Sequence, residues 1–430
     1  RYREGVYVGY RYFDSVNKPV LFPFGYGLSY SEFALGQTRA FPEPSGHVRV
    51  DVSVKNIGSR AGKETVQVYV SAPEGRLDKP YQVLAAFAKT GELAAGEEVL
   101  LHLEFDLADL ASYDSDRSCY LLEEGLYVLR VGRDSRNTRP VLGLELDRTC
   151  VTRRVKKLPG TVDFRDFRPE KARRRLPEED LPVLKLSGEG IRCQEVSYER
   201  KEKIDPLAEK LTNEELALVT TGAFQPGARF LTAIGEASSH VSGAAGETTG
   251  CFRARGLKPI IMADGPAGLR LNPHYVVNEN GSVTSYGHNP MIDSMGHLLP
   301  GVAIWWLRYS SNRTMRRIRK SRMTIYDQFA TAIPIGTAIA QTWNLSLAAS
   351  WGAIVGDEMQ RFGVQLWLAP ALNIQRDVRC GRNFEYFSED PLVSGKFAAA
   401  ITKGVQGNPG CGTTIKHFAA NNQETNRIFA

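Results

Sequence analysis

Hydrophobic and polar residues alternate along several short stretches in the first third of the sequence. Over residues 48–55, valines at every second position alternate with Arg, Asp, Ser and Lys, which is the pattern of a half-buried strand. Residues 101–107 alternate in the same way, and stretches such as 56–58 and 72–73 supply the Gly and Pro of turns. Short alternating strands divided by such turns are typical of an antiparallel β-sandwich, which we predict over residues 36–148.

The pattern changes after residue 203, where short apolar runs alternate with helical stripes. Three such runs suit strands that are buried on both faces: residues 256–263, 364–369 and 413–415. Asn344 and Gly363 bracket an amphipathic helix between the first two runs, and Pro391 begins another helix before the third. An order of strand, helix, strand predicts parallel pairing, and hence a parallel sheet.

Two stretches fit neither pattern. Residues 149–203 are rich in Arg, Lys, Glu and Pro, so we interpret them as a charged linker that runs over the surface. Residues 273–330 interrupt the alternation of strands and helices, and we interpret them as an insertion. The sequence gives no function for this insertion.

Composition and charge fit a globular protein of several domains without a membrane span. The 430 residues are 42% hydrophobic and 24% charged, and no apolar run is long enough to cross a bilayer. The net charge of +6 is concentrated in residues 153–175 and 308–322. A basic patch can bind nucleic acid, but neither stretch carries a recognition motif. We interpret them as a solvated linker and a solvated loop, and we expect no nucleic-acid or membrane partner.

The cysteines and the start of the sequence add two expectations. None of the six cysteines forms a C-x-x-C pair, and no His or Cys stands at zinc-ligand spacing. We therefore expect reduced thiols, no metal and a cytoplasmic location. The sequence begins at Arg1 with neither Met nor a hydrophobic leader, so we expect a segment of a longer protein.

Polar residues gather directly after each of the three predicted strands. These clusters are residues 264–270, 376–385 and 416–427. The carboxyl ends of parallel strands form the active-site face of (β/α) barrels, so the clusters are expected to meet. Carboxylate, guanidinium and ammonium groups that converge there would hydrogen-bond a polyhydroxylated ligand.

Long motifs in these clusters resemble the barrel domain of glycoside hydrolase family 3. The resemblance lies in residues 367–391, in Lys416-His417-Phe418 and in residues 421–427. Residues 262–270 and 334–344 are similar to the opening of the same domain.

The front of the chain resembles other parts of that family. Residues 2–12 and 21–30 are similar to the tail of its (α/β)6 sandwich domain, and the predicted β-sandwich resembles its fibronectin type III-like domain. The fold class that follows is multidomain, a β-sandwich followed by a partial TIM-type (β/α) barrel. The expected domains are the sandwich tail at residues 1–35 and the fibronectin type III-like domain at residues 36–148. The charged linker follows at residues 149–203, and the first part of the barrel at residues 204–430.

The resemblance also implies a set of substrate-binding residues. Asp264, Arg382, Lys416 and His417 would bind the non-reducing sugar in the −1 subsite, with Arg427 as a further member of that group. Taken singly, three of these residues have a purely structural alternative, namely a helix cap for Asp264, an internal ion pair for Arg382 and a buried core position, with its hydrogen bonds satisfied, for His417. Because the whole set follows strand ends, we favour the pocket.

Two departures from the family pattern bear on catalysis. The family's usual order is barrel, sandwich domain, fibronectin-like domain, whereas here the barrel comes last, as in a circularly permuted branch. Family members use an Asp nucleophile and a Glu acid/base in a retaining mechanism. The nucleophile belongs to a Ser/Thr-Asp-Trp motif, and the only Ser-Asp pair here, Ser115-Asp116, is followed by Arg117. We therefore assign no catalytic residue in this chain and expect negligible hydrolysis from it alone.

The resemblance implies part of a retaining, exo-acting β-glycosidase that removes terminal β-D-glucosyl or related residues from small oligosaccharides or glycosides. No cofactor is expected. The alternatives within the family are a β-xylosidase, an N-acetylglucosaminidase and a phosphorylase. The alternative outside enzymes is a non-catalytic carbohydrate-binding remnant.

Overall fold

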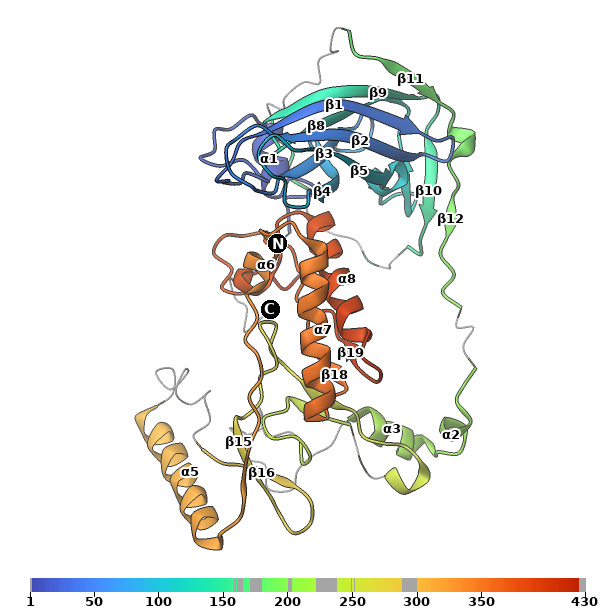
Figure 1. The fold of residues 1–430 in the computed structure, drawn as a ribbon. Helices are drawn as coiled ribbons and strands as arrows, with labels where there is room; N and C mark the ends of the chain where they lie inside the picture. The colour runs from blue at the N-terminus through green and yellow to red at the C-terminus, as the bar shows by residue number, and fades with distance from the viewer. Residues whose placement is uncertain are drawn as a thin grey trace. The chain divides into compact units, whose positions relative to one another are not determined.

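The computed structural model describes residues 2–157, 160, 165–170, 180–199, 203–221, 238–248, 250, 252–287 and 300–424 (Figure 1). It divides into two compact units. The first consists of Arg1–Arg200 with Glu389–Leu392, and the second of Lys201–Ser388 with Val393–Ala430. Among the described residues, no helix combines the length and hydropathy that crossing a membrane would require.

The first unit is built mainly from antiparallel strands around one hydrophobic core. A three-stranded sheet has the order β1 (Phe33–Pro42), β2 (His47–Asn56), β5 (Glu98–Asp106). A second sheet has the order β11 (Val183–Leu186), β9 (Thr138–Leu146), β8 (Gly125–Gly132), β3 (Thr65–Ser71), β4 (Val83–Lys89). A third has the order β12 (Gln194–Glu195), β10 (Cys150–Arg154), β7 (Cys119–Leu122), β6 (Ser112–Asp114). The helical elements are α1 (Tyr10–Ser15), η1 (Leu107–Leu110) and η2 (Gly188–Gly190).

The predicted alternation of buried and exposed residues is confirmed in β2. Its valines at 48, 50, 52 and 54 are completely buried, and they belong to the same core cluster as Val66 and Val68 of β3. Side chains of a strand point alternately to its two faces, so every second valine reaches this core. The sheet that contains β2 and the sheet that contains β3 therefore pack face to face, as in a β-sandwich.

Part of the stretch interpreted as a charged linker pairs with the sandwich. Strand β11 runs parallel to β9, and β12 runs parallel to β10. Leu186 and Ile191 are buried in the sandwich core. The edge of a sheet offers unpaired backbone groups, and these accept a strand whatever the charge of its side chains. The composition of this stretch carried no signal for that pairing.

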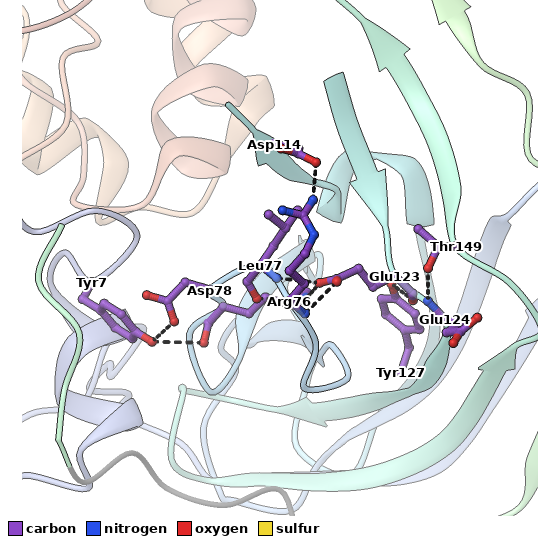
Figure 2. A network of polar contacts seen from close by, with 10 residues as sticks. Tyr7, Arg76, Leu77, Asp78, Asp114, Glu123, Glu124, Tyr127 and Thr149 are labelled. Atoms are coloured by element: carbon purple, nitrogen blue, oxygen red, sulfur yellow. Dashed lines mark hydrogen bonds and ion pairs between the residues drawn. The ribbon is translucent and has the colours of Figure 1, made fainter. Parts of the chain in front are cut away.

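The loop between β3 and β4 is fastened to the sandwich by Glu123. Its carboxylate accepts hydrogen bonds from the backbone nitrogens of Arg76, at 2.8 Å, and Leu77, at 3.1 Å (Figure 2). It also forms an ion pair with Lys79. Burial would raise the pKa of Glu123, but these donors outweigh it and lower that pKa. The Tyr127 hydroxyl donates to the Glu123 carbonyl at 2.8 Å.

The second unit contains the predicted parallel strands. Its main sheet has the order β13 (Gly246–Glu247), β14 (Ile261–Ala263), β18 (Leu366–Trp367), β19 (Gly412–Thr413). Strands β14, β18 and β19 pair in parallel, and β13 pairs antiparallel with β14. Helix α7 (Leu345–Phe362) lies between β14 and β18 in the chain, and α8 (Pro391–Gln406) between β18 and β19. The order of strand, helix, strand is thus confirmed. Within the described residues this sheet does not close into a barrel.

The ends of α7 follow from its sequence. The Asn344 side chain accepts a hydrogen bond from the Leu347 backbone nitrogen at 3.0 Å, which caps the first turn. Gly363 ends the helix with a φ of 73°, a conformation that glycine adopts without strain. Strand β14 is shorter than the apolar run that predicted it, because Pro259 has no N–H and Gly256 adopts a φ of 96°.

The stretch interpreted as an insertion has structure of its own. Strands β15 (His274–Val277), β16 (Val283–Ser285) and β17 (Ile325–Asp327) form a small antiparallel sheet. Helix α5 (Gly301–Ser321) precedes β17, so the solvated loop expected over residues 308–322 is wrong. No Gly or Pro interrupts residues 302–321, so the helix can form without a break. The side chains of Leu307 and Ile318 are buried. The smaller elements of the second unit are α2 (Pro206–Glu209), α3 (Asn213–Thr221), η3 (Arg253–Arg255), α6 (Gly336–Ala340) and η5 (Asn383–Glu385).

Candidate functional site

The parallel strands of the second unit bring two predicted site residues together. Asp264 directly follows β14, and Lys416 lies three residues after β19. The backbone of Lys416 is held by Pro370 and Leu372, which follow β18, through hydrogen bonds of 3.0 and 2.7 Å. Residues 152 positions apart in the chain therefore meet at one edge of the sheet.

Asp264 is the centre of a pair of ionic contacts. Its Oδ1 accepts from Lys416 Nζ at 2.5 Å, and its Oδ2 accepts from Arg270 Nη2 at 2.6 Å. The Asp264 and Lys416 side chains are about one-fifth exposed, at 22% and 18%, so water reaches them only in part. Burial would raise the pKa of Asp264, but the hydrogen bond and charge of Lys416, with the charge of Arg270, outweigh it and lower that pKa. Asp264 is therefore an ionised acceptor at neutral pH.

Two glycines shape the loop that carries Asp264. Gly265 and Gly268 have φ values of 117° and 112°. A Cβ on Gly265 would lie 2.0 Å from the Gly268 carbonyl oxygen, which leaves no room for a side chain. The Arg270 backbone nitrogen donates to the Asp264 carbonyl at 2.8 Å, and Trp367 Nε1 donates to the Gly265 carbonyl at 3.0 Å. The loop thus turns back on itself and is anchored to β18.

Arg382 is held by a neighbour three positions along the chain. Its Nε pairs with the carboxylate of Glu385, a side chain that is only 3% exposed. Burial would lower the pKa of Arg382, but Glu385 and, further along, the charge of Asp264 outweigh it and raise that pKa. The internal ion pair considered as a structural alternative for Arg382 is therefore present. A guanidinium has five N–H donors, so this pair leaves room for further hydrogen bonds.

His417 contacts a buried tyrosine. Its Nδ1 lies 3.2 Å from the Tyr386 hydroxyl, and the two rings meet edge to face with centroids 6.2 Å apart. The same hydroxyl donates to the Asn421 carbonyl at 3.2 Å and accepts from Asn421 Nδ2 at 2.8 Å. Burial is the main cause that raises the pKa of Tyr386.

The structure describes four of the five predicted site residues. Asp264 and Lys416 are in direct contact, and Asp264 bears ion pairs rather than a helix cap. Arg382 pairs with Glu385, the residue before Tyr386, and His417 contacts the Tyr386 hydroxyl. Arg427 lies outside the described residues. The sugar-binding role of the set stays a prediction.

Sequence reasoning assigned no role to several residues that complete the site. They are Arg270, Glu385, Tyr386 and Asn421. The spacing of three between Arg382 and Glu385 was a usable signal, because opposite charges at that distance pair across one helical turn. The contacts of Tyr386 had no local signal. Among the described residues, no group of three or more His, Cys, Asp or Glu could hold a metal ion.

Known protein families match two parts of the chain. The glycosyl hydrolase family 3 N-terminal domain matches residues 319–427, and a fibronectin type III-like domain matches residues 64–135. Beta-glucosidase A of Butyrivibrio fibrisolvens is 31% identical over 485 residues, which cover 99% of this chain and 50% of that protein. A beta-glucosidase of Ruminococcus albus is 32% identical over 458 residues, which cover 100% of this chain and 41% of that protein.

The chain belongs to glycosyl hydrolase family 3.

A solved structure of this family supports the assignment. The chain superposes on a beta-glucosidase from Paenibacillus barengoltzii with a TM-score of 0.70 and 30% identity, over 98% of this chain and 43% of that one. The chain thus spans about half the length of the relatives it matches, or somewhat less. Arg382, Lys416 and His417 fall inside the matched family 3 domain, and Asp264 precedes it. The fibronectin-like match comes before the hydrolase match in the chain.

Proposed function

We propose that this chain supplies the −1 sugar subsite of a retaining, exo-acting β-glucosidase. The observation that carries the proposal is the contact between Asp264 and Lys416, which holds an ionised carboxylate beside an ammonium at the ends of parallel strands. The relatives in the same family are named beta-glucosidases.

The geometry suits the recognition of a sugar by its hydroxyl groups. The Asp264 carboxylate can only accept hydrogen bonds, whereas Lys416 and Arg382 can only donate them. A pair of sugar hydroxyls satisfies both kinds of partner, because each hydroxyl donates once and accepts twice. Charge-assisted bonds of this type are stronger than neutral ones, so they fix the orientation of the sugar ring.

The proposed reaction uses two carboxylates that we do not assign to residues of this chain. In a retaining glycosidase one carboxylate attacks the anomeric carbon, while the other protonates the leaving oxygen. The part proposed for Asp264, Lys416, Arg382, His417 and Arg427 is to bind and orient the terminal sugar. The domain order fits a circularly permuted member of the family, and the sheet β14-β18-β19 fits the first part of a (β/α) barrel. The substrate is a small oligosaccharide or glycoside.

Calorimetric titration of the chain with glucose tests the proposal. Asp264→Asn keeps the size of the side chain but removes its charge. Loss of one charge-assisted bond of about 1.5–3 kcal/mol predicts roughly 10- to 100-fold weaker binding. Asp357→Asn is the matched control, because Asp357 forms an exposed ion pair with Arg361 on α7. Equal affinity of both variants and the unaltered chain would contradict the proposed role of Asp264.

The same titration separates the alternatives. Tighter binding of xylose or N-acetylglucosamine than of glucose would favour the other specificities of the family. Glucose binding with no turnover in any protein that contains this chain would favour the non-catalytic carbohydrate-binding remnant.

A further inference from the structure

Helix α5 turns one side toward the rest of the second unit. Leu307 and Ile318 are buried on this side. Between them in the chain, the Ser311 hydroxyl donates to the carbonyl of Gly287, shortly after β16, at 3.0 Å. Residues 307, 311 and 318 follow the spacing of one helical face, so this face holds α5 in the unit. The opposite face points outward.

The outward face of α5 begins with an apolar half. Its side chains are those of Val302 and of Trp305, Trp306 and Tyr309, which follow Val302 by three, four and seven residues. Val302, Trp305 and Tyr309 are 79%, 64% and 54% exposed. The rings of Trp305 and Tyr309 stack with their centroids 5.5 Å apart and an angle of 12° between their planes. Exposed apolar side chains that gather in one patch mark an interaction surface.

The same face continues as a basic half. Arg313, Arg316, Arg317 and Lys320 are exposed, and they follow Val302 by 11, 14, 15 and 18 residues, which is again the spacing of one helical face. Residues 301–321 include no Asp or Glu. The outward face therefore joins exposed aromatic rings to a run of cations, and the helix has no acidic residue to neutralise them.

We propose that the outward face of α5 binds the surface of a membrane that contains anionic lipids. Trp and Tyr rings prefer the headgroup level of a bilayer, where the apolar body of the ring is buried and its polar tip is hydrated. Lys and Arg side chains are attracted to the negative surface potential of anionic lipids. An amphipathic helix with both kinds of residue lies in the plane of the membrane. With 21 residues α5 is about 30 Å long, so both halves of its outward face can contact a flat surface at once.

The arrangement favours a lipid surface over a single-stranded nucleic acid. Proteins that bind single strands combine a basic groove along the backbone with aromatic faces on which successive bases stack. On α5 the rings of Trp305 and Tyr309 each cover one face of the other, and the basic half of the outward face lies further along the helix. The face of a helix is convex, so it offers no groove. A membrane surface needs neither a groove nor free ring faces.

The sequence gave a different expectation for this part of the chain. The expectation of no membrane partner rested on a solvated loop over residues 308–322. Those residues are helical up to Ser321, and four of their cations share one face. The structure thus removes the ground for that expectation.

Co-sedimentation of the chain with lipid vesicles tests the proposal. We expect binding to vesicles of phosphatidylcholine with about one-quarter phosphatidylserine, and weaker binding to phosphatidylcholine alone. The double variant Arg316→Gln/Arg317→Gln removes two cations and should bind the mixed vesicles roughly 30-fold more weakly. The matched control is Lys396→Gln/Lys403→Gln, which removes the same charge from exposed positions of α8 and should bind as the unaltered chain does.

The apolar half is tested with the same mixed vesicles. Trp305→Ala should weaken binding roughly 10-fold, because a large apolar side chain no longer enters the membrane. Tyr113→Ala, which removes an exposed ring of the sandwich, is the control and should bind normally. The tryptophan emission of the unaltered chain should also shift to shorter wavelength on these vesicles, since Trp305 and Trp306 move from water into lipid.

Equal binding of the unaltered chain to both kinds of vesicle, or to neither, would overturn the proposal, and this result depends on no variant. Equal losses in the two double variants would overturn it as well, because net charge alone would then explain the binding. A single-stranded DNA oligonucleotide that binds more tightly than the mixed vesicles, and is released by Arg316→Gln/Arg317→Gln, would assign the outward face to nucleic acid instead.

Discussion

Removing either partner of the Asp264–Lys416 ion pair should destabilise the second unit by a predictable amount. The two side chains touch at 2.5 Å and are about one-fifth exposed. A hydrogen bond between charged groups contributes about 1.5–3 kcal/mol to stability. Because Arg270 stays within 2.6 Å of Asp264, the carboxylate keeps one cation when Lys416 is replaced. We therefore expect Lys416→Met to lower the free energy of unfolding by about 2 kcal/mol, the lower part of that range.

A double-mutant cycle isolates the interaction from the rest of each side chain. It uses Asp264→Asn, Lys416→Met and the double variant, and it should give a coupling energy of about 1–3 kcal/mol. The exposed pair Asp357–Arg361 on α7 serves as the matched control. Helical pairs of that type couple by about 0.3–0.5 kcal/mol.

The assay is urea unfolding followed by tryptophan fluorescence. All five tryptophans lie between positions 305 and 367, so their fluorescence reports on the second unit alone. The pKa of Asp264 is lower in the folded chain than its ordinary value of 3.8. The coupling should thus be fully present above that value and disappear as the pH falls through the lowered pKa. A coupling at neutral pH no larger than that of the control pair would refute the reasoning.

Three further substitutions test separate parts of the structure. Gly265→Ala should lower the free energy of unfolding of the second unit by about 1–3 kcal/mol or more, because the new Cβ would meet the Gly268 carbonyl oxygen and the φ of this residue is 117°. The control is Gly395→Ala, where a Cβ would meet open space. Asn344→Ala should cost about 1 kcal/mol in the same fluorescence assay, since it removes the cap of α7, and no change would show that the cap is unimportant. Glu123→Gln should destabilise the sandwich at neutral pH, as monitored by circular dichroism. Since the pKa of Glu123 is lowered by folding, the difference from the unaltered chain should vanish as the pH falls through that pKa, and a difference that persists in acid would contradict the ion-pair account.

Features governed by local sequence were predictable. The valines of β2 fixed its buried face, because alternation along a strand is a property of neighbouring residues. Asn344 and Gly363 marked the ends of α7, since capping depends on the side chain or φ of a single residue. The parallel pairing of β14, β18 and β19 followed from the order of strands and helices.

Features that depend on distant residues were not predictable from the pattern alone. The contact of Tyr386 with His417 joins residues 31 positions apart and depends on how η5 and the segment after β19 fold. The pairing of β11 with β9 depends on an open sheet edge rather than on the composition of β11. The four described site residues came from a resemblance of motifs. The partners Arg270 and Tyr386, and Asn421 beside Tyr386, emerged only from the structure, whereas the spacing of Arg382 and Glu385 was a usable signal.

The most direct test of the central claim is a crystal structure of the chain soaked with glucose. The account predicts one sugar at the carboxyl ends of β14, β18 and β19, with hydroxyl groups within 3.2 Å of Asp264 and Lys416. A sugar bound elsewhere, or an empty site at a glucose concentration that saturates the calorimetric titration, would contradict it.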